Sequence, residues 1–264
     1  MPHMQAKPGP DPAACACAAP SPFVYPDTAS TRAGIEAVSS KLAGGSIAIV
    51  GLGGTGSVVL DLLSKTPAGR IILIDGDKAE PHNAFRWPGA MSIEDASAGI
   101  YKVDYFARVY GRMHKGIVAH PVHLGPETLN LLDEADFVFS CVDSVEARAF
   151  LIPELEKRDL PFIDCGLGLS LVDDELMGLV RVTTSTPGMR GHVHQKQRIP
   201  ILGRDDDDLY RSNIQVADLN MLAATLAVIQ YKQLRAFYSD AEAEYHMIYA
   251  TDGNYVINED QPEG

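Results

Sequence analysis

The feature that most constrains the fold of this chain is a glycine-rich turn between a buried strand and a helix. Residues 46–51 form a continuous apolar run, which is typical of a parallel strand buried on both faces. The run leads into the turn at 51–56 (GLGGTG), and residues 55–65 carry the apolar side chains of an amphipathic helix. Backbone N–H groups in such a turn, together with the helix N-terminus, face an anionic ligand. The motif therefore predicts a phosphate site.

Each glycine of the turn has an expected role. Gly51 permits the turn itself, because it can adopt backbone angles that other residues avoid. Gly53 and Gly54 are expected to let the backbone approach the phosphates closely, and Gly56 to let the helix pack tightly.

The same alternation of strand and helix continues along the chain. Further buried strands are expected at residues 70–75, 116–120, 137–141 and 161–165. Helices are expected at residues 31–42, 93–113, 126–134 and 145–158. This order predicts an α/β fold, a Rossmann-like doubly wound and mainly parallel sheet.

The last third of the chain has a different pattern. Residues 177–183 alternate between apolar and polar, which indicates a more exposed, antiparallel strand. A crossover loop is expected at about 185–211, a long helix at about 212–238, and two short strands at 245–250 and 255–258. We expect residues 1–30 to be a flexible Ala/Pro-rich tail, and residues 31–264 to form one domain.

Composition excludes several classes of function. The formal net charge of −13 disfavours nucleic acid as the main partner, because an acidic surface repels phosphate backbones. No apolar run approaches the ~20 residues that a membrane-spanning helix needs. A membrane partner is therefore not expected.

The four cysteines fit neither a disulfide framework nor a zinc site. Cys15 and Cys17 lie in the tail, whereas Cys141 and Cys165 end predicted core strands, and no Cys-x-x-Cys pair occurs. Buried free cysteines without a disulfide pattern indicate a reducing, cytoplasmic compartment.

The loop that follows the second strand favours ATP over NAD. Asp75 ends this strand, where an acid commonly accepts a ribose hydroxyl, so it is compatible with either nucleotide. The loop continues with Asp77, Asn83 and Arg86, and Asn83 comes eight residues after Asp75. An ATP site needs a cation such as Arg86, because a triphosphate is more negative than a pyrophosphate bridge.

This spacing resembles the ThiF/MoeB/ubiquitin-activating superfamily, whose members adenylate the C-terminus of a ubiquitin-like protein. The resemblance implies that Asp75 holds ribose, with Asp77 beside it, and that Asn83 and Arg86 meet the ATP phosphates. Within the superfamily, the chain most resembles ThiF-like enzymes of bacterial ubiquitin-like conjugation operons, as judged from residues 82–90 and the long helix expected at about 212–238.

Two later positions extend the resemblance. It implies that Lys102 on the following helix contacts phosphate, and that Asp143, after the fourth strand, manages Mg²⁺ and the phosphates. A trailing arginine at Arg148 belongs to the same pattern. Independently, a carboxylate at the carboxyl end of a parallel strand faces the ligand crevice. As alternatives, Arg86 and Lys102 could be solvated cations, and Asp143 a helix N-cap.

The chain also departs from the pattern of the superfamily. Conjugating members carry a nucleophilic cysteine in the crossover, but residues 185–212 contain none, and the zinc-binding cysteine pairs of the sulfur-transfer members are missing. His192 and His194 could share one face of a strand and bind metal, although a solvated loop fits them better. Homodimeric members supply an arginine from the neighbouring subunit, for which Arg32 is the candidate.

The expected function is ATP- and Mg²⁺-dependent adenylation of the C-terminal carboxylate of a small ubiquitin-like or sulfur-carrier protein, by a homodimer. Without a crossover cysteine, the activated carboxylate would pass to an external thiol acceptor protein. Three alternatives stay open: a ThiF-like enzyme acting on a peptide or tRNA, an NAD(P)-dependent oxidoreductase, and a catalytically silent partner of another activating subunit.

Overall fold

The computed structural model describes residues 21–201 and 214–262. One mixed sheet runs through the described chain in the strand order β3-β2-β1-β4-β5-β6-β7-β8. The first five strands in this order are parallel, and β6, β7 and β8 continue the sheet antiparallel. The strands are β1 (Gly44–Val50), β2 (Ala68–Ile74), β3 (Ile117–His120), β4 (Phe137–Ser140), β5 (Phe162–Val172), β6 (Glu175–Ser185), β7 (His246–Ala250) and β8 (Tyr255–Glu259).

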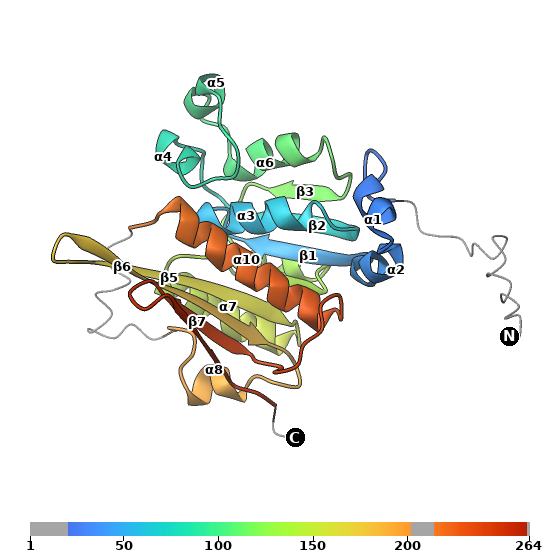
Figure 1. Cartoon of the computed structure of the whole chain (residues 1–264). Coiled ribbons are helices and arrows are strands. Elements are labelled where there is room, and N and C mark those ends of the chain that lie inside the picture. The colour runs from blue at the N-terminus through green and yellow to red at the C-terminus, as the bar shows by residue number, and fades with distance from the viewer. Residues whose placement is uncertain (1–20, 202–213, 263–264) are drawn as a thin grey trace, which may run out of the picture.

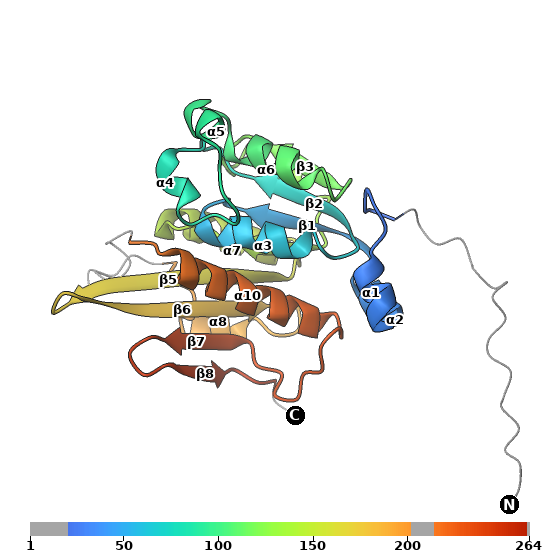
Figure 2. The ribbon, with the colours of Figure 1, turned by 45° about the horizontal axis from the view of Figure 1, so that its top comes forward.

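Helices cover both faces of this sheet, as the doubly wound pattern predicts (Figures 1 and 2). The helices are α1 (Thr28–Ala33), α2 (Glu36–Ser39), α3 (Gly54–Leu63), α4 (Pro81–Ala84), α5 (Ile93–Ser97), α6 (Lys102–Tyr110), α7 (Val145–Lys157), α8 (Gly191–Gln195) and α10 (Ala217–Leu234), with 3₁₀ turns η1 (Ser40–Leu42) and η2 (Leu129–Leu132). Buried side chains of α3, α6 and α10 share one core cluster, and those of α7, α8 and η2 share another.

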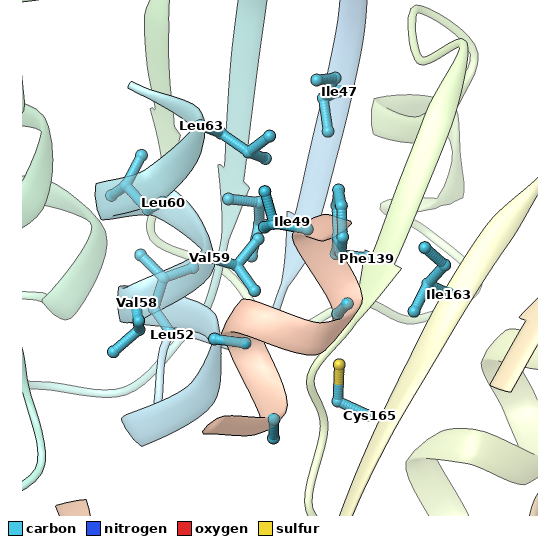
Figure 3. Close-up of a cluster of buried hydrophobic side chains, with 14 of the residues drawn as sticks. Ile47, Ile49, Leu52, Val58, Val59, Leu60, Leu63, Phe139, Ile163 and Cys165 are labelled. Carbon is cyan, nitrogen blue, oxygen red and sulfur yellow. The ribbon is translucent and has the colours of Figure 1, made fainter. Parts of the chain in front are cut away.

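The two clusters are separated by the sheet, because successive strand residues point to opposite faces. In β1, Ile47 and Ile49 belong to the cluster under α3 and α10, whereas Ala48 and Val50 belong to the cluster under α7. Figure 3 shows Ile49 beside Val59 of α3, with Phe139 on the other side of Ile49. Burial on both faces explains why the parallel strands are continuous apolar runs in the sequence.

The register of the parallel strands brings four strand ends together. Val50 is paired with Ile74 on one side and with Ser140 on the other, and Ser140 is paired with Asp164. The segments that follow β1, β2 and β4, and the second half of β5, therefore meet at one edge of the sheet. Ligands of open α/β sheets bind at this edge.

Three helices predicted from the sequence are shorter or divided. The region 31–42 contains α1, α2 and η1, because Gly34 adopts φ +67° and ends α1. The region 93–113 is divided into α5 and α6 around Gly99, which has φ +62°. The region 126–134 forms only the 3₁₀ turn η2. Glycines with positive φ caused the first two differences, since they interrupt otherwise helical patterns.

The crossover and the tail also differ in part from the prediction. Residues 191–195 of the crossover form helix α8, while its later part, 202–213, lies outside the described residues, as does the start of the long helix predicted at 212. Residues 1–20, with Cys15 and Cys17, are likewise not described. Within residues 21–30, the Val24 N–H donates to the Met113 carbonyl at 2.8 Å, and α1 begins at Thr28. This part of the predicted tail is thus fixed to the domain.

Among the described helices, none combines the length and apolarity that crossing a bilayer requires.

Candidate nucleotide site

A cavity of about 390 Å³ opens at the edge where the parallel strands end. Its wall contains the glycine-rich turn after β1, the residues that follow β2 and β4, and side chains from β5 and α10. Of the residues predicted to bind the nucleotide or the metal, those lining it are Gly51, Gly53, Gly54, Asp75, Asp77, Arg86, Lys102 and Asp143, and Arg148, Cys141 and Cys165 line it as well. Eight positions spread over 93 residues of sequence thus converge on one cavity.

The glycines of the turn serve different purposes. Gly51 has φ +88°, and a Cβ atom there would lie 2.7 Å from the Cys141 carbonyl oxygen. A Cβ on Gly56 would overlap the Gly51 carbonyl oxygen, so this glycine allows α3 to pack on the turn, as predicted. Gly53 has open space around its missing Cβ, which leaves room for a ligand.

Gly54 corrects the sequence interpretation in part. It lines the cavity, but a Cβ there would overlap the Asn220 side chain of α10. Its small size is needed for helix packing as well as for approach by a ligand. Asn220 also accepts a hydrogen bond from Thr55 Oγ1 at 2.9 Å, which joins α10 to the glycine turn.

Asp75 ties the glycine turn to the loop after β2. One carboxylate oxygen accepts the Leu52 N–H at 2.6 Å, and the other accepts the Asp77 N–H at 2.8 Å. Burial raises the pKa of Asp75, and the nearby Lys102 charge and the two N–H donors oppose that shift. A carboxylate offers about four acceptor positions. Asp75 therefore retains the capacity to accept a hydroxyl group in the cavity.

Lys102 brings a positive charge to the same wall. It begins α6, and its Nζ lies 2.6 Å from Asp77 Oδ2 and 3.9 Å from Asp75 Oδ1. The hydrogen bond from Lys102 is the main cause that lowers the pKa of Asp77. The two acidic residues thus hold the ammonium group in place at the cavity.

Arg86 and Asp143 supply charges of opposite sign from different loops. Arg86 follows α4 and is half-buried, and its Nε is buried with no hydrogen-bond partner among the described residues. Burial lowers the pKa of Arg86, and the negative charge of Asp143 opposes the shift. A buried donor without a partner is costly unless a ligand satisfies it. Phosphate oxygens are suited to that role, because they bind guanidinium groups strongly.

The donor set also suits a metal ion carried by phosphates. Asp143 is exposed at the cavity, and no group of three or more His, Cys, Asp or Glu side chains within the described residues could hold an ion by itself. Mg²⁺ at nucleotide sites usually takes one or two carboxylates and completes its shell with phosphates and water. Asp143 fits this arrangement.

Besides Gly56, two residues of the sequence prediction do not line the cavity. Asn83 is buried in the short helix α4, where its Oδ1 accepts the Glu80 N–H at 2.9 Å and so caps that helix. Arg32 is exposed on α1, which precedes β1, whereas the glycine turn follows β1 (Figure 1). The seven residues of β1 separate them by about 20 Å, at ~3.3 Å per residue.

The histidine pair in the crossover belongs to a helix, not to a strand. His192 and His194 lie in α8, where His192 Nε2 contacts the Thr184 carbonyl at 3.0 Å and His194 Nε2 contacts a Glu156 carboxylate oxygen at 2.9 Å. The two side chains thus have different partners, and the segment is neither the favoured solvated loop nor the alternative strand.

Two free thiols, Cys141 and Cys165, line the cavity. The contact between their side chains, followed by burial, raises the pKa of Cys141 well above its usual value. Because the thiolate is the reactive form, Cys141 is not suited to carry an activated carboxylate.

Two contributors to the site were missed in the sequence. Asn220 lies 165 positions from Thr55 and reaches the glycine turn only through the packing of α10 on α3. A polar residue within the apolar stripe of that helix was the available signal. Asp164 lies behind the cavity wall on β5 and is fully buried, and its position inside an apolar strand run was a similar signal.

The model of the ThiF family matches residues 29–213, which is more than half of the sequence. The chain belongs to the ThiF family. The prediction made from the sequence about family and fold is therefore confirmed.

Curated relatives of this ThiF protein are ubiquitin-like modifier-activating enzymes. The enzyme 5 of Drosophila mojavensis is 28% identical over 145 residues, which is 49% of this chain and 35% of that protein. The enzyme 5 of Aedes aegypti is 26% identical over 160 residues, which is 55% of this chain and 39% of that protein. The matches thus span little more than a third of these relatives.

Solved structures of similar fold include MccB of E. coli and PaaA. MccB in complex with MccA-N7isoASN superposes with a TM-score of 0.65 at 20% identity, over 86% of this chain and 67% of that one. PaaA superposes with a TM-score of 0.65 at 17% identity, over 90% and 75%. MccB has also been solved with ATP, at a TM-score of 0.61 and 19% identity. At these identities the similarity establishes the fold alone.

Proposed function

We propose that this ThiF protein is an ATP-dependent adenylyltransferase that activates the C-terminal carboxylate of a ubiquitin-like or sulfur-carrier protein. The observation that carries the proposal is the convergence of Arg86, Lys102 and Asp143 with the glycine turn on one cavity. Arg86 in particular has a buried Nε whose donor needs an acceptor. Its relatives named as activating enzymes support the same substrate class.

The reaction requires little acid–base chemistry, because the attacking carboxylate is already ionised. One of its oxygens would form a bond to the α-phosphorus of ATP as the bond to the β-phosphate oxygen breaks, and pyrophosphate leaves. Backbone N–H groups of the glycine turn, with Arg86 and Lys102, would stabilise charge on the phosphates. Asp143 would hold Mg²⁺, which neutralises part of the triphosphate charge when bound.

Asp75 and Asp77 would orient this machinery. The remaining acceptor capacity of Asp75 suits a ribose hydroxyl, and Asp77 keeps Lys102 directed at the cavity. Asn83 would act indirectly, since its side chain caps α4 and so positions the backbone that leads to Arg86. Free thiols in the described core agree with a cytoplasmic location.

Onward transfer would use an external acceptor. The segment expected to carry a transferring cysteine contains none, the raised pKa of Cys141 disfavours its thiolate, and Cys165 is buried. A separate thiol acceptor protein is therefore part of the proposal.

A second candidate is activation of a peptide carboxylate. It is favoured by the similarity to MccB, which is described in complex with N-formylated MccA and with ATP. An NAD(P)-dependent oxidoreductase gives Arg86 and Asp143 no role. A catalytically silent subunit does not require the buried, unsatisfied donor of Arg86.

ATP–pyrophosphate exchange tests the proposal. Radiolabelled pyrophosphate should enter ATP only when a ubiquitin-like or sulfur-carrier protein with an intact C-terminus is present. Exchange with short peptides alone would favour the second candidate. Absence of both exchange and ATP binding with every carboxylate would exclude adenylation.

A further inference from the structure

A buried ion cluster lies at the cavity wall, and the chemistry proposed above does not use it: Arg148 lines the cavity, and its partner Asp164 lies behind the wall. Asp164 of β5 is fully buried, and its Oδ1 accepts a hydrogen bond from Ser140 Oγ at 2.6 Å. The same oxygen lies 3.4 Å from Arg148 Nε, and Oδ2 accepts from Arg181 Nη2 at 2.6 Å. Three strands and helix α7 thus meet at one carboxylate.

Arg148 connects this carboxylate to the backbone beside the cavity. Its side chain is 3% exposed. Nη2 donates to the carbonyls of Val142 at 2.6 Å and of Cys165 at 3.3 Å, and Nη1 donates to the carbonyl of Asp143 at 3.4 Å. One guanidinium group therefore joins the segment after β4 to β5.

The physical reason for an arginine here is its geometry. A guanidinium offers five N–H donors in a fixed planar fork, whereas an ammonium is a single point charge on a flexible stem. Only the fork can contact three carbonyls and a carboxylate together. Burial of such a charge is tolerable because Asp164 compensates it.

These hydrogen bonds from Arg148 to backbone carbonyls, here called the clamp, hold the main chain of Asp143, a charged residue at the cavity. Asp143 has its carbonyl held by Arg148, while its side chain lies exposed at the cavity near Arg86. A loop residue with a free main chain would have to lose that freedom when a metal ion binds, which costs conformational entropy. The clamp removes this freedom before the ligand arrives.

We propose that Arg148, anchored by Asp164, is a positioning residue that fixes the main chain of Asp143 and thereby sets the Mg²⁺ concentration at which the site works. The inference rests on the proposed function, because it gives Asp143 the role of metal ligand. It adds a determinant of metal affinity that does not itself contact the metal.

A matched arginine allows a purely structural role to be separated from positioning. Arg190 also holds three carbonyls, those of Glu156 at 2.9 Å, Thr186 at 3.2 Å and Leu160 at 3.4 Å. It does not line the cavity. Arg148→Lys and Arg190→Lys therefore weaken similar clamps, but only the first is beside Asp143.

The first measurement is amide hydrogen exchange without nucleotide, which tests the clamp whether or not the protein is an adenylyltransferase. Arg148→Lys should speed exchange in peptides covering 141–147 by about tenfold, and Arg190→Lys should leave those peptides unchanged. Should Arg148→Lys fail to fold, Ser140→Ala removes one hydrogen bond of Asp164 and is expected to produce a smaller increase in the same peptides. Unchanged protection in the folded variants would overturn the proposal.

The second measurement is the Mg²⁺ dependence of ATP binding and of pyrophosphate exchange. Arg148→Lys should raise the half-saturating Mg²⁺ concentration by about tenfold, as the loss of a residue supporting a metal ligand typically does. Arg190→Lys should not change it. Equal shifts in the two variants, or none in Arg148→Lys, would overturn the proposal. A wild-type protein that binds Mg²⁺-ATP but shows no exchange would refute adenylation and leave the positioning role standing.

Discussion

At the scale of single residues, the charges around the cavity are held to different degrees. Lys102 is paired with Asp77 and lies near Asp75, whereas the Nε of Arg86 has no partner among the described residues. A held cation offers a fixed charge, and a buried donor without a partner offers a hydrogen bond that only a ligand can complete. Arg86 is therefore the residue whose removal should affect the ligand most and the fold least.

We predict that Arg86→Ala lowers the rate of pyrophosphate exchange by about 10²–10³-fold, which is the usual cost of removing one preorganised donor. The midpoint of thermal unfolding should stay close to that of the wild type, because no hydrogen bond of Arg86 is lost. Arg112→Ala, at an exposed arginine outside the cavity, is the control and should be fully active. Full exchange activity in Arg86→Ala would refute its role.

Asp143 provides a second prediction at this scale. Because it is an exposed carboxylate at the cavity whose charge acts on Arg86, Asp143→Ala should abolish measurable exchange at ordinary Mg²⁺ concentrations without loss of helix content in circular dichroism. Asp133→Ala, at an exposed carboxylate away from the cavity, is the control. Partial recovery of Asp143→Ala at high Mn²⁺ would support the assignment as metal ligand, and unchanged activity would contradict it.

At the scale of elements, the glycine turn and α3 form one unit in which neighbouring glycines have separate physical roles. Gly56 allows the first turn of α3 to contact the Gly51 carbonyl, while Gly53 borders open space in the cavity. This separates stability from ligand binding within four residues of sequence.

Gly56→Ala should therefore mainly affect the free energy of unfolding, and Gly53→Ala should mainly affect ATP binding. Gly56→Ala forces backbone apart and should destabilise the protein by about 1–3 kcal/mol, the usual range for overpacking. Gly53→Ala should leave the free energy of unfolding unchanged, yet weaken ATP binding, because its methyl group would occupy the approach of the phosphates. Urea unfolding and ATP titration measure the two effects. Tight ATP binding by Gly53→Ala would show that the phosphates do not pass close to this residue.

The antiparallel extension contains a buried histidine that should make the fold sensitive to acid. His246 of β7 contacts Thr183 Oγ1 through Nδ1 at 3.0 Å. Burial, reinforced by the charges of Arg198 and Arg181, lowers the pKa of His246 from 6.5 to about 3. The unfolded chain therefore binds a proton at a higher pH than the folded one. Stability contributed by neutral His246 is complete above about pH 6.5 and is lost progressively as the pH falls towards 3.

We predict that lowering the pH from about 7 to about 5 reduces the free energy of unfolding, with about 1–2 kcal/mol of the loss due to His246. His246→Gln should show a correspondingly smaller pH dependence in urea unfolding. His194→Gln, at an exposed histidine of α8, is the control and should keep the wild-type dependence. An identical pH dependence in His246→Gln and the wild type would contradict the assignment.

At the scale of the whole molecule, the position of Arg32 separates two models of the active assembly. Helix α1 lies at the amino end of β1 (Figure 2), whereas the cavity is lined by Val50 and Gly51 at the carboxyl end of that strand. Arg32 of the same chain is therefore too distant to reach the cavity. It can act only if a second copy places its own Arg32 there.

Mixing inactive variants tests this homodimer proposal. Arg32→Ala and Arg86→Ala should each be inactive alone, but heterodimers formed by mixing would contain one site with both arginines. Statistical reassociation should then restore about a quarter of the wild-type exchange activity, because half of the dimers are mixed and each has one intact site. Full activity of Arg32→Ala alone, or no recovery on mixing, would exclude a role for Arg32 across a dimer.

The sequence determined the architecture of this protein and most of the residues around its cavity. Continuous apolar runs such as 46–51 can be satisfied only by burial on both faces, and a glycine-rich turn after such a run can only lie at the carboxyl edge of the sheet. Local pattern therefore sufficed to place Asp75 and Asp143 at this edge, and the resemblance to the ThiF superfamily added Arg86 and Lys102.

Only the tertiary structure decided which of these residues support others and which remain available to a ligand. The caps at Asn83, the contact of Asn220 with the glycine turn, and the clamp of Arg148 on the Asp143 backbone depend on which elements pack together. Hydrogen bonds across 165 residues leave no periodic trace in the sequence, because they are set by the docking of α10 on α3. Local pattern determines the element and the position at which a residue lies, and packing determines what its side chain contacts.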